Sequence, residues 1–128
     1  MFVIVEVNLK NEGRLNMSLG TLEIEILNSV WKLQALDEDM NISVKDVVDD
    51  MSENGLERAY TTVKTVMDRL SSKELLVRYR AGKKFFYKSV MDKNEMAIVA
   101  IKEISTQFFD GDEAKMMRFI ETQCLNLV

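Results

Sequence analysis

The sequence predicts a mainly α-helical protein that contains one small β-hairpin. Two patterns carry this prediction. Apolar residues recur at helical spacing both before and after the middle of the chain, whereas the middle holds two β-prone runs, LLVRYR (75–80) and KFFYKS (84–89), separated by a glycine. The length of 128 residues suits one domain, or one domain with a helical appendage.

The first predicted helix covers residues 19–35, where Leu27 and Trp31 widen a stripe formed by Leu22, Ile26, Val30 and Leu33. An acidic stretch, LDEDMN (36–41), then breaks the helical period. Ser43 opens a second helix because its hydroxyl can cap the first turn, and Asp46 stands three positions further on. Gly55 lies just beyond the end of this helix, where a left-handed residue is expected. The apolar face consists of Val44, Val47, Val48 and Met51.

The third predicted helix, residues 59–72, has one apolar stripe and one polar face. The stripe is formed by Val63, Val66, Met67 and Leu70, which cluster within about 100° of arc. The opposite face presents Thr61, Lys64, Thr65, Asp68, Arg69 and Ser72, with Thr62 at its flank.

The two β-prone runs predict a hairpin that turns at Ala81-Gly82-Lys83, with a basic tip formed by Arg80, Lys83 and Lys84. Helical spacing returns from Asp92 onward and stops at Asp110-Gly111-Asp112, which separates two further helices. Their apolar positions are Met96, Val99, Ala100, Ile104 and Phe108, then Met117, Ile120, Cys124 and Leu127.

The composition excludes several classes of catalytic and metal site. The chain has no His and one Cys, so it cannot form a Ser-His-Asp or Cys-His centre, a His metal site or an internal disulfide. An enzyme could act only through carboxylate, Lys or Tyr chemistry, and no convergent cluster of these groups supports one. We therefore expect no enzyme activity, metal or cofactor. No segment has the length or flanks of a membrane span or signal peptide, and the lone Cys suits a reducing cytoplasm.

Charge is unevenly distributed along the chain. The net charge of −4 argues by itself against nucleic acid as a partner. Residues 57–93, however, carry a net charge of +6, whereas residues 1–56 and 94–128 carry −7 and −3. A basic segment inside an acidic chain creates a local field that attracts phosphate groups.

Three helices followed by a two-stranded hairpin predict a winged helix-turn-helix, in which the third helix enters the major groove of double-stranded DNA. Lys64 and Arg69 suit base edges or phosphates, and the threonines suit phosphates and thymine methyls. The alternative is a winged-helix module that docks on an acidic protein and does not read DNA. The expected DNA-binding residues are Thr61, Thr62, Lys64, Thr65, Arg69, Arg80, Lys83 and Lys84.

The predicted organisation has three parts: an N-terminal extension (1–17), a winged-helix DNA-binding domain (18–91) and a helical dimerisation region (92–128). The codons for Glu12-Gly13-Arg14 can spell a ribosome-binding sequence, so Met17 is an alternative start. The expected dimerisation residues are Met96, Val99, Ile104, Phe108, Met117, Ile120, Cys124 and Leu127.

Four segments carry a family resemblance: LGTLEIEILNSVW (19–31), AYTTVKTVMDRLSSKELL (59–76), GKKFFYKS (82–89) and FFDGDEAKMMRFIE (108–121). They resemble the penicillinase-repressor family of winged-helix regulators of β-lactamase, methicillin-resistance and copper-transport genes. The resemblance implies a homodimer that represses transcription from a palindromic operator. It also implies that the third helix is the recognition helix and that the last two helices form the dimer.

Three positions depart from the pattern of that family. Asp68 stands where relatives usually have Thr or Asn, and it either accepts from a cytosine amine or holds Arg69 and Lys64 in position; we favour the second interpretation. Cys124 lies on an apolar stripe and lacks the second Cys of the copper-responsive branch, so we expect a core thiol and no copper site. Arg118-Phe119 is the nearest match to the Asn-Phe cleavage site of the antibiotic-responsive branch, which leaves a sensor or protease partner open.

Overall fold

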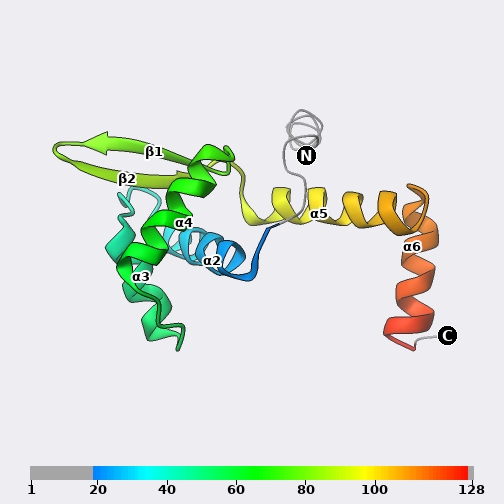
Figure 1. The fold of residues 1–128 in the computed structure, drawn as a ribbon. Helices are drawn as coiled ribbons and strands as arrows, with labels where there is room; N and C mark the ends of the chain where they lie inside the picture. The colour runs from blue at the N-terminus through cyan, green and yellow to red at the C-terminus, as the bar shows by residue number, and fades with distance from the viewer. Residues whose placement is uncertain (1–18, 127–128) are drawn as a thin grey trace. The chain divides into compact units, whose positions relative to one another are not determined.

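The computed structural model describes residues 19–126, which form two compact units, residues 19–93 and 94–126. We call them the winged unit and the C-terminal unit. The mainly helical fold with one hairpin is confirmed (Figure 1). The elements are α2 (Thr21–Leu36), α3 (Val44–Glu53), α4 (Tyr60–Ser72), β1 (Leu76–Ala81), β2 (Lys84–Ser89), α5 (Lys93–Phe108), α6 (Glu113–Phe119) and the π-helix η1 (Ile120–Cys124). The extension 1–17, the alternative start Met17 and the apolar residue Leu127 lie outside the described residues.

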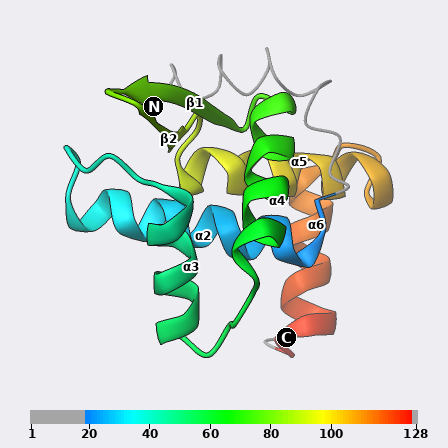
Figure 2. The same ribbon diagram turned by 60° about the vertical axis from the view of Figure 1, so that its left-hand side comes forward.

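The core of the winged unit lies where α2, α3 and α4 pack against one another (Figure 2). All four apolar residues predicted for the third helix are buried, and Leu70 is completely inaccessible. The core also contains Ile26 and Val30 from α2 and Val47 from α3, and all three are buried. A single apolar stripe on each helix therefore builds a core that leaves the other face of α4 free.

Both ends of α3 follow the sequence expectation. The amide of Asp46 donates to Ser43 Oγ over 3.1 Å, and the amide of Ser43 donates to Asp46 Oδ2 over 2.9 Å. This reciprocal pair is a capping box that satisfies amides left without helical partners. At the other end, Gly55 has a φ of +78°, which only glycine adopts without strain.

The hairpin is antiparallel, and Ala81 pairs with Lys84. The turn therefore consists of Gly82 and Lys83 alone, one residue fewer than predicted, because Ala81 belongs to the ladder. Gly82 has a φ of +69°, as the first central residue of a type II′ turn requires. Ile42 adds a further backbone contact, since its carbonyl accepts from the amide of Tyr87 over 2.9 Å. The sequence analysis missed this bridge, because Ile42 follows an acidic loop.

Side chains of α2 hold the end of β2 and the segment that follows it. Gln34 Nε2 donates to Ser89 Oγ, and Gln34 Oε1 accepts from the Ser89 amide, each over 2.9 Å. Trp31 Nε1 donates to the Met91 carbonyl, also over 2.9 Å. The end of the hairpin is thereby fixed to the first helix of the winged unit.

In the C-terminal unit, the predicted helix break at 110–112 is confirmed. Asp110 and Gly111 have positive φ angles, and Asp112 accepts from the Lys115 amide to begin α6. The last predicted helix begins as α6, and after Phe119 the chain widens into the π-helix η1, where the Leu125 amide donates to the Ile120 carbonyl. Within residues 19–126, no helix combines the length and the apolar character needed to cross a membrane.

Candidate nucleic-acid interface

The polar face of α4 is accessible. Its apolar stripe is turned into the core, so the residues on the other side point away from the winged unit. All five DNA-binding residues predicted on this helix are exposed: Thr61, Thr62, Lys64, Thr65 and Arg69. Two cations and three short hydroxyl side chains therefore share one helical face.

The first turn of α4 has no side-chain cap. The first amides of any α-helix lack helical partners, and a phosphate is well suited to accept from them. Thr61 and Thr62 lie in this turn and add hydroxyl donors. Thr65 differs, because its hydroxyl donates to the Thr61 carbonyl over 2.9 Å. In this rotamer Thr65 offers DNA its methyl group and no free hydroxyl proton.

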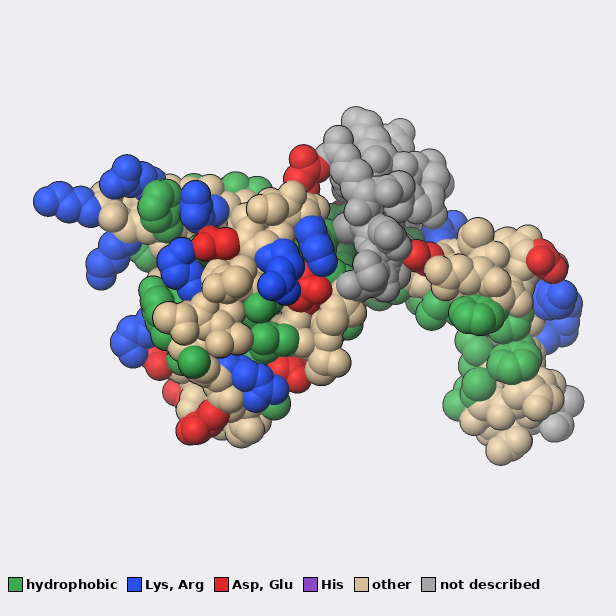
Figure 3. Space-filling model, in the orientation of Figure 1, with side chains coloured by type: hydrophobic (Ala, Val, Ile, Leu, Met, Phe, Trp, Pro, Cys, Tyr) green, Lys and Arg blue, Asp and Glu red, His purple; other side chains and the backbone are tan. Residues whose placement is uncertain are grey.

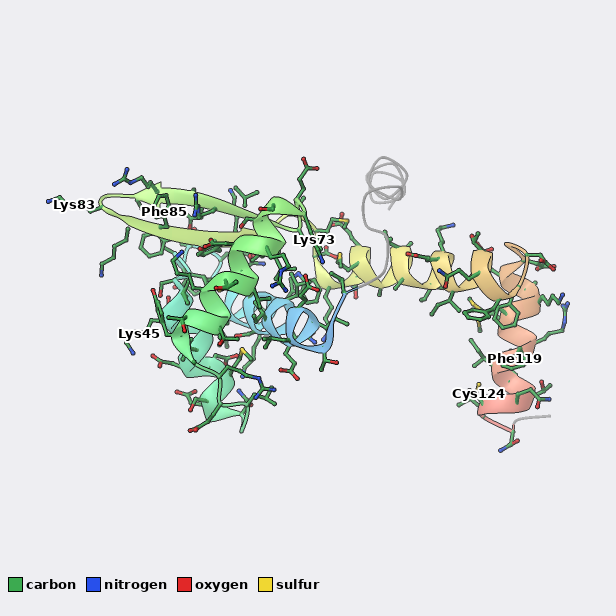
Figure 4. The ribbon with its side chains drawn as sticks, viewed as in Figure 1. Lys45, Lys73, Lys83, Phe85, Phe119 and Cys124 are labelled. Atoms are coloured by element: carbon green, nitrogen blue, oxygen red, sulfur yellow. The ribbon has the colours of Figure 1, made fainter. Side chains whose placement is uncertain are left out.

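The hairpin carries the second group of predicted DNA-binding residues. Arg80, Lys83 and Lys84 are all exposed, and Lys83 projects from the tip of the hairpin (Figure 4). In the space-filling view, Lys and Arg side chains gather over the hairpin and α4 (Figure 3). The structure therefore brings the two predicted sets together on adjacent elements of the winged unit.

The ring of Phe85 stacks against two arginines of the hairpin, and this contact was not predicted from the sequence. The guanidinium carbons of Arg78 and Arg80 lie 4.5 Å and 5.3 Å from the centroid of its ring. Alternation along paired strands places all three on one face, because Arg80 pairs with Phe85 and Arg78 with Tyr87. Strand register, once known, would have revealed this stack.

Asp68 connects α4 to the hairpin. Its Oδ2 accepts from Lys64 Nζ over 2.7 Å, and its Oδ1 accepts from Tyr87 Oη over 2.7 Å and from Arg78 Nη1 over 3.4 Å. Asp68 thus holds Lys64, as the favoured interpretation expects, but its second cation is Arg78 rather than Arg69. We call Asp68, Lys64, Arg78 and Tyr87 the Asp68 cluster.

Burial and hydrogen bonding shift the pKa of Asp68 in opposite directions. Burial raises the pKa of Asp68, but hydrogen bonds from Lys64 and Tyr87 and the nearby positive charges outweigh this effect, so the pKa lies below its ordinary value. Burial and the hydrogen bond to Asp68 raise the pKa of the Tyr87 phenol. Asp68 is therefore an anion, and Tyr87 a neutral donor, at neutral pH.

The C-terminal unit exposes several apolar side chains. Four of the predicted dimerisation residues, Ile104, Phe108, Met117 and Cys124, are exposed, and Phe108 is 74% exposed. The prediction of a core thiol is wrong, because the stripe that carries Cys124 faces outward in the single chain. Ile120 is half-buried, whereas Met96 and Val99 are buried within the chain. Figure 4 shows Cys124 and Phe119 on this unit.

A family model described as penicillinase repressor matches residues 19–126. The chain belongs to the penicillinase repressor family. The match spans both units, including the α4 face and the apolar surface of α5, α6 and η1. A comparison with curated proteins found no match. Membership places this chain in a family of transcriptional repressors.

Proposed function

We propose that this chain represses transcription as a homodimer that binds a palindromic DNA operator. The two copies of α4 occupy major grooves about one helical turn apart, and the hairpins contact the flanking backbone. The bound dimer then blocks the promoter that contains the operator. The observation that carries this proposal is the exposed Lys/Thr/Arg face of α4 beside a basic hairpin.

Electrostatics supports DNA as the partner. Cations at the tip and on the sides of the hairpin suit phosphates, which supply affinity without regard to sequence. Lys64 and Arg69 on α4 can reach base edges, which carry the sequence information. Acidic groups dominate the rest of the chain, so indiscriminate binding through other faces is disfavoured.

The apolar surface of the C-terminal unit supports the homodimer. Ile101, Ile104, Phe108, Met117, Phe119 and Leu125 are all exposed in the single chain. Exposed apolar side chains of this size are unfavourable in water, and a second copy of the chain would cover them symmetrically. Two linked DNA-binding faces bind a palindrome more tightly than one, because binding of the second half-site becomes intramolecular.

The direct test is selection of binding sites from random duplex DNA with the full chain, followed by footprinting of the enriched sequence. We expect an inverted repeat, protected by a dimer, whose affinity falls steeply as salt rises. Enrichment of no sequence, together with capture of an acidic protein by the basic face, would instead support the protein-interaction module.

A matched pair of variants tests whether α4 is the helix that contacts the bases. Lys64→Ala on α4 should cost about 1 to 3 kcal/mol of binding to the selected operator and relax its preference at one base pair. Lys45→Ala is the control, because Lys45 forms the same kind of ion pair, with Asp49 four residues later, on α3. Equal losses in the two variants would contradict the assignment of α4 as the recognition helix.

A further inference from the structure

The Asp68 cluster places an anion in the middle of the proposed DNA-binding face. Lys64 lies one helical turn before Asp68 on α4, and the other two members, Arg78 and Tyr87, are directly paired across the hairpin. One carboxylate therefore contacts two cations and a phenol from three elements, α4, β1 and β2.

The oxygens of this carboxylate are already engaged. Oδ1 accepts from Tyr87 and Arg78, and Oδ2 accepts from Lys64. Tyr87 is only 2% exposed, so its hydroxyl keeps this acceptor rather than water. A cytosine amine would have to displace one of these donors, which makes the carboxylate a poor reader of bases.

The two cations of the cluster are only partly available to phosphates. A Lys or Arg that pairs with an internal carboxylate either leaves that partner or brings its negative charge close to the DNA backbone. Both routes reduce the number of counterions released on binding, and counterion release supplies nearly all of sequence-independent affinity. The other cations of the hairpin, such as Lys83 at the tip, are not part of this cluster.

We propose that Asp68 is a positioning residue that sets the specificity of this repressor. By holding Lys64 and Arg78, it lowers the affinity for random DNA while it keeps both side chains aligned for the operator. This inference rests on the proposed function, because it assigns a role within the same DNA-binding face.

The test compares Asp68→Asn with the native chain on random duplex DNA and on the selected operator. Asn keeps an oxygen that can accept from Tyr87 but removes the charge. We expect affinity for random DNA to rise about tenfold, and its dependence on log salt to steepen by about 1 to 2, at about 0.9 per phosphate gained. Operator affinity should change less, so the ratio of specific to non-specific affinity falls.

Asp49→Asn is the matched control. Asp49 also pairs with a Lys four residues earlier, Nζ to Oδ2 over 2.9 Å, but it lies on α3. The variant makes the same change in net charge as Asp68→Asn. Because Asp49 lies outside the proposed DNA-binding face, the salt dependence on random DNA should stay unchanged. Equal steepening in both variants, or none in Asp68→Asn, would overturn the proposal.

Tyr87→Phe separates charge from packing. It removes the phenol hydrogen bond but leaves the carboxylate and both cations, so it should lower stability without steepening the salt dependence. If Tyr87→Phe reproduces the Asp68→Asn effect on random DNA, Asp68 acts only by fixing the hairpin to α4, and the specificity role is wrong.

A further measurement uses variants that retain Asp68, so it does not depend on whether Asp68→Asn folds. Arg78 and Lys83 are both exposed cations of the hairpin, and only Arg78 pairs with Asp68. Arg78→Ala should reduce the salt dependence on random DNA by less than half of the reduction caused by Lys83→Ala. Equal reductions would contradict the proposal. A native chain that binds no duplex DNA at all would instead refute the proposed function.

Discussion

The two units of the molecule differ in the share of their large apolar residues that is buried. In the winged unit, Val63 and Leu70 are completely buried, and the exposed side of α4 is mostly polar or basic. In the C-terminal unit, Phe108 and Ile104 are exposed at 74% and 47%. The winged unit therefore completes its own core, whereas the C-terminal unit leaves apolar side chains exposed that the proposed dimer would cover.

Substitutions of apolar residues are therefore expected to have different effects in the two units. A substitution in the core of the winged unit should reduce the stability of the monomer. A substitution on the exposed surface of α5 or α6 should leave the monomer intact and weaken association. Oligomeric state and unfolding free energy, measured on the same variants, therefore distinguish the two kinds of substitution.

The largest effect is expected from Phe108→Asp. A charge at this exposed position costs the monomer little but would be buried without a partner in the proposed dimer. Sedimentation should show a monomer, and operator affinity should fall about 100- to 10,000-fold as avidity is lost. Thr106→Asp is the control, because Thr106 is exposed on the same helix, two residues away. A variant that remains dimeric would show that this surface is not the dimer interface.

Leu70→Ala should have the next largest effect. Leu70 is completely buried between α4 and its neighbours, so its truncation should lower the free energy of unfolding by about 2 to 5 kcal/mol. Urea denaturation checks this value. Thr62→Ala, on the exposed face of the same helix, should change stability by less than about 0.5 kcal/mol. A small loss for Leu70→Ala would mean that the core of the winged unit is incomplete.

Acid should destabilise the winged unit through Glu23. Burial raises the pKa of Glu23, but hydrogen bonds from Lys73 and from the Gly20 amide outweigh it, so the pKa lies below its ordinary value. The unfolded chain then binds more protons than the native state, so stability is present above the ordinary pKa and is lost as pH falls through the native one.

The measurement is urea denaturation at a series of pH values between about 6 and 3. Glu23→Gln should show a smaller loss of stability across this range, because it removes one of the groups that link stability to protons. Glu38→Gln, which removes a carboxylate in the exposed loop after α2, is the control. An unchanged pH dependence in Glu23→Gln would rule out this linkage.

The smallest effects are expected at the tip of the hairpin. Lys83→Ala and Lys84→Ala should each reduce the dependence of log affinity on log salt by about 1, equally for operator and random DNA, because each would remove one contact with a phosphate in the proposed complex. Lys45→Ala on α3 should change neither value; Figure 4 shows Lys45 and Lys83 on different elements of the winged unit. Loss of binding to the operator alone would instead mark the hairpin as a reader of sequence.

Local patterns predicted much of the winged unit. The stripe of α4, the Ser43 cap and the hairpin each depend on residues close together in the sequence, and the structure confirms them. The exposed polar face of α4 followed from the stripe, because a helix that buries one side presents the other. Whether these exposed residues bind DNA stays a prediction.

Contacts between distant residues could not be predicted in the same way. The hydrogen bond from Tyr87 to Asp68 joins residues 19 positions apart, and it depends on how the hairpin docks on α4. The sequence therefore left two interpretations of Asp68 open. Periodicity likewise identified the stripe that carries Cys124, but a stripe does not reveal whether its own chain or a second copy covers it.

The contact between Trp31 and the Met91 carbonyl also gives the molecule an internal optical reporter. Trp31 is the chain's one tryptophan, and its indole is fixed to the segment that ends the winged unit. Its fluorescence therefore comes from a single, defined environment. Release of residues 89–91 from α2 would change this emission, so detachment of the hairpin end can be followed without a label.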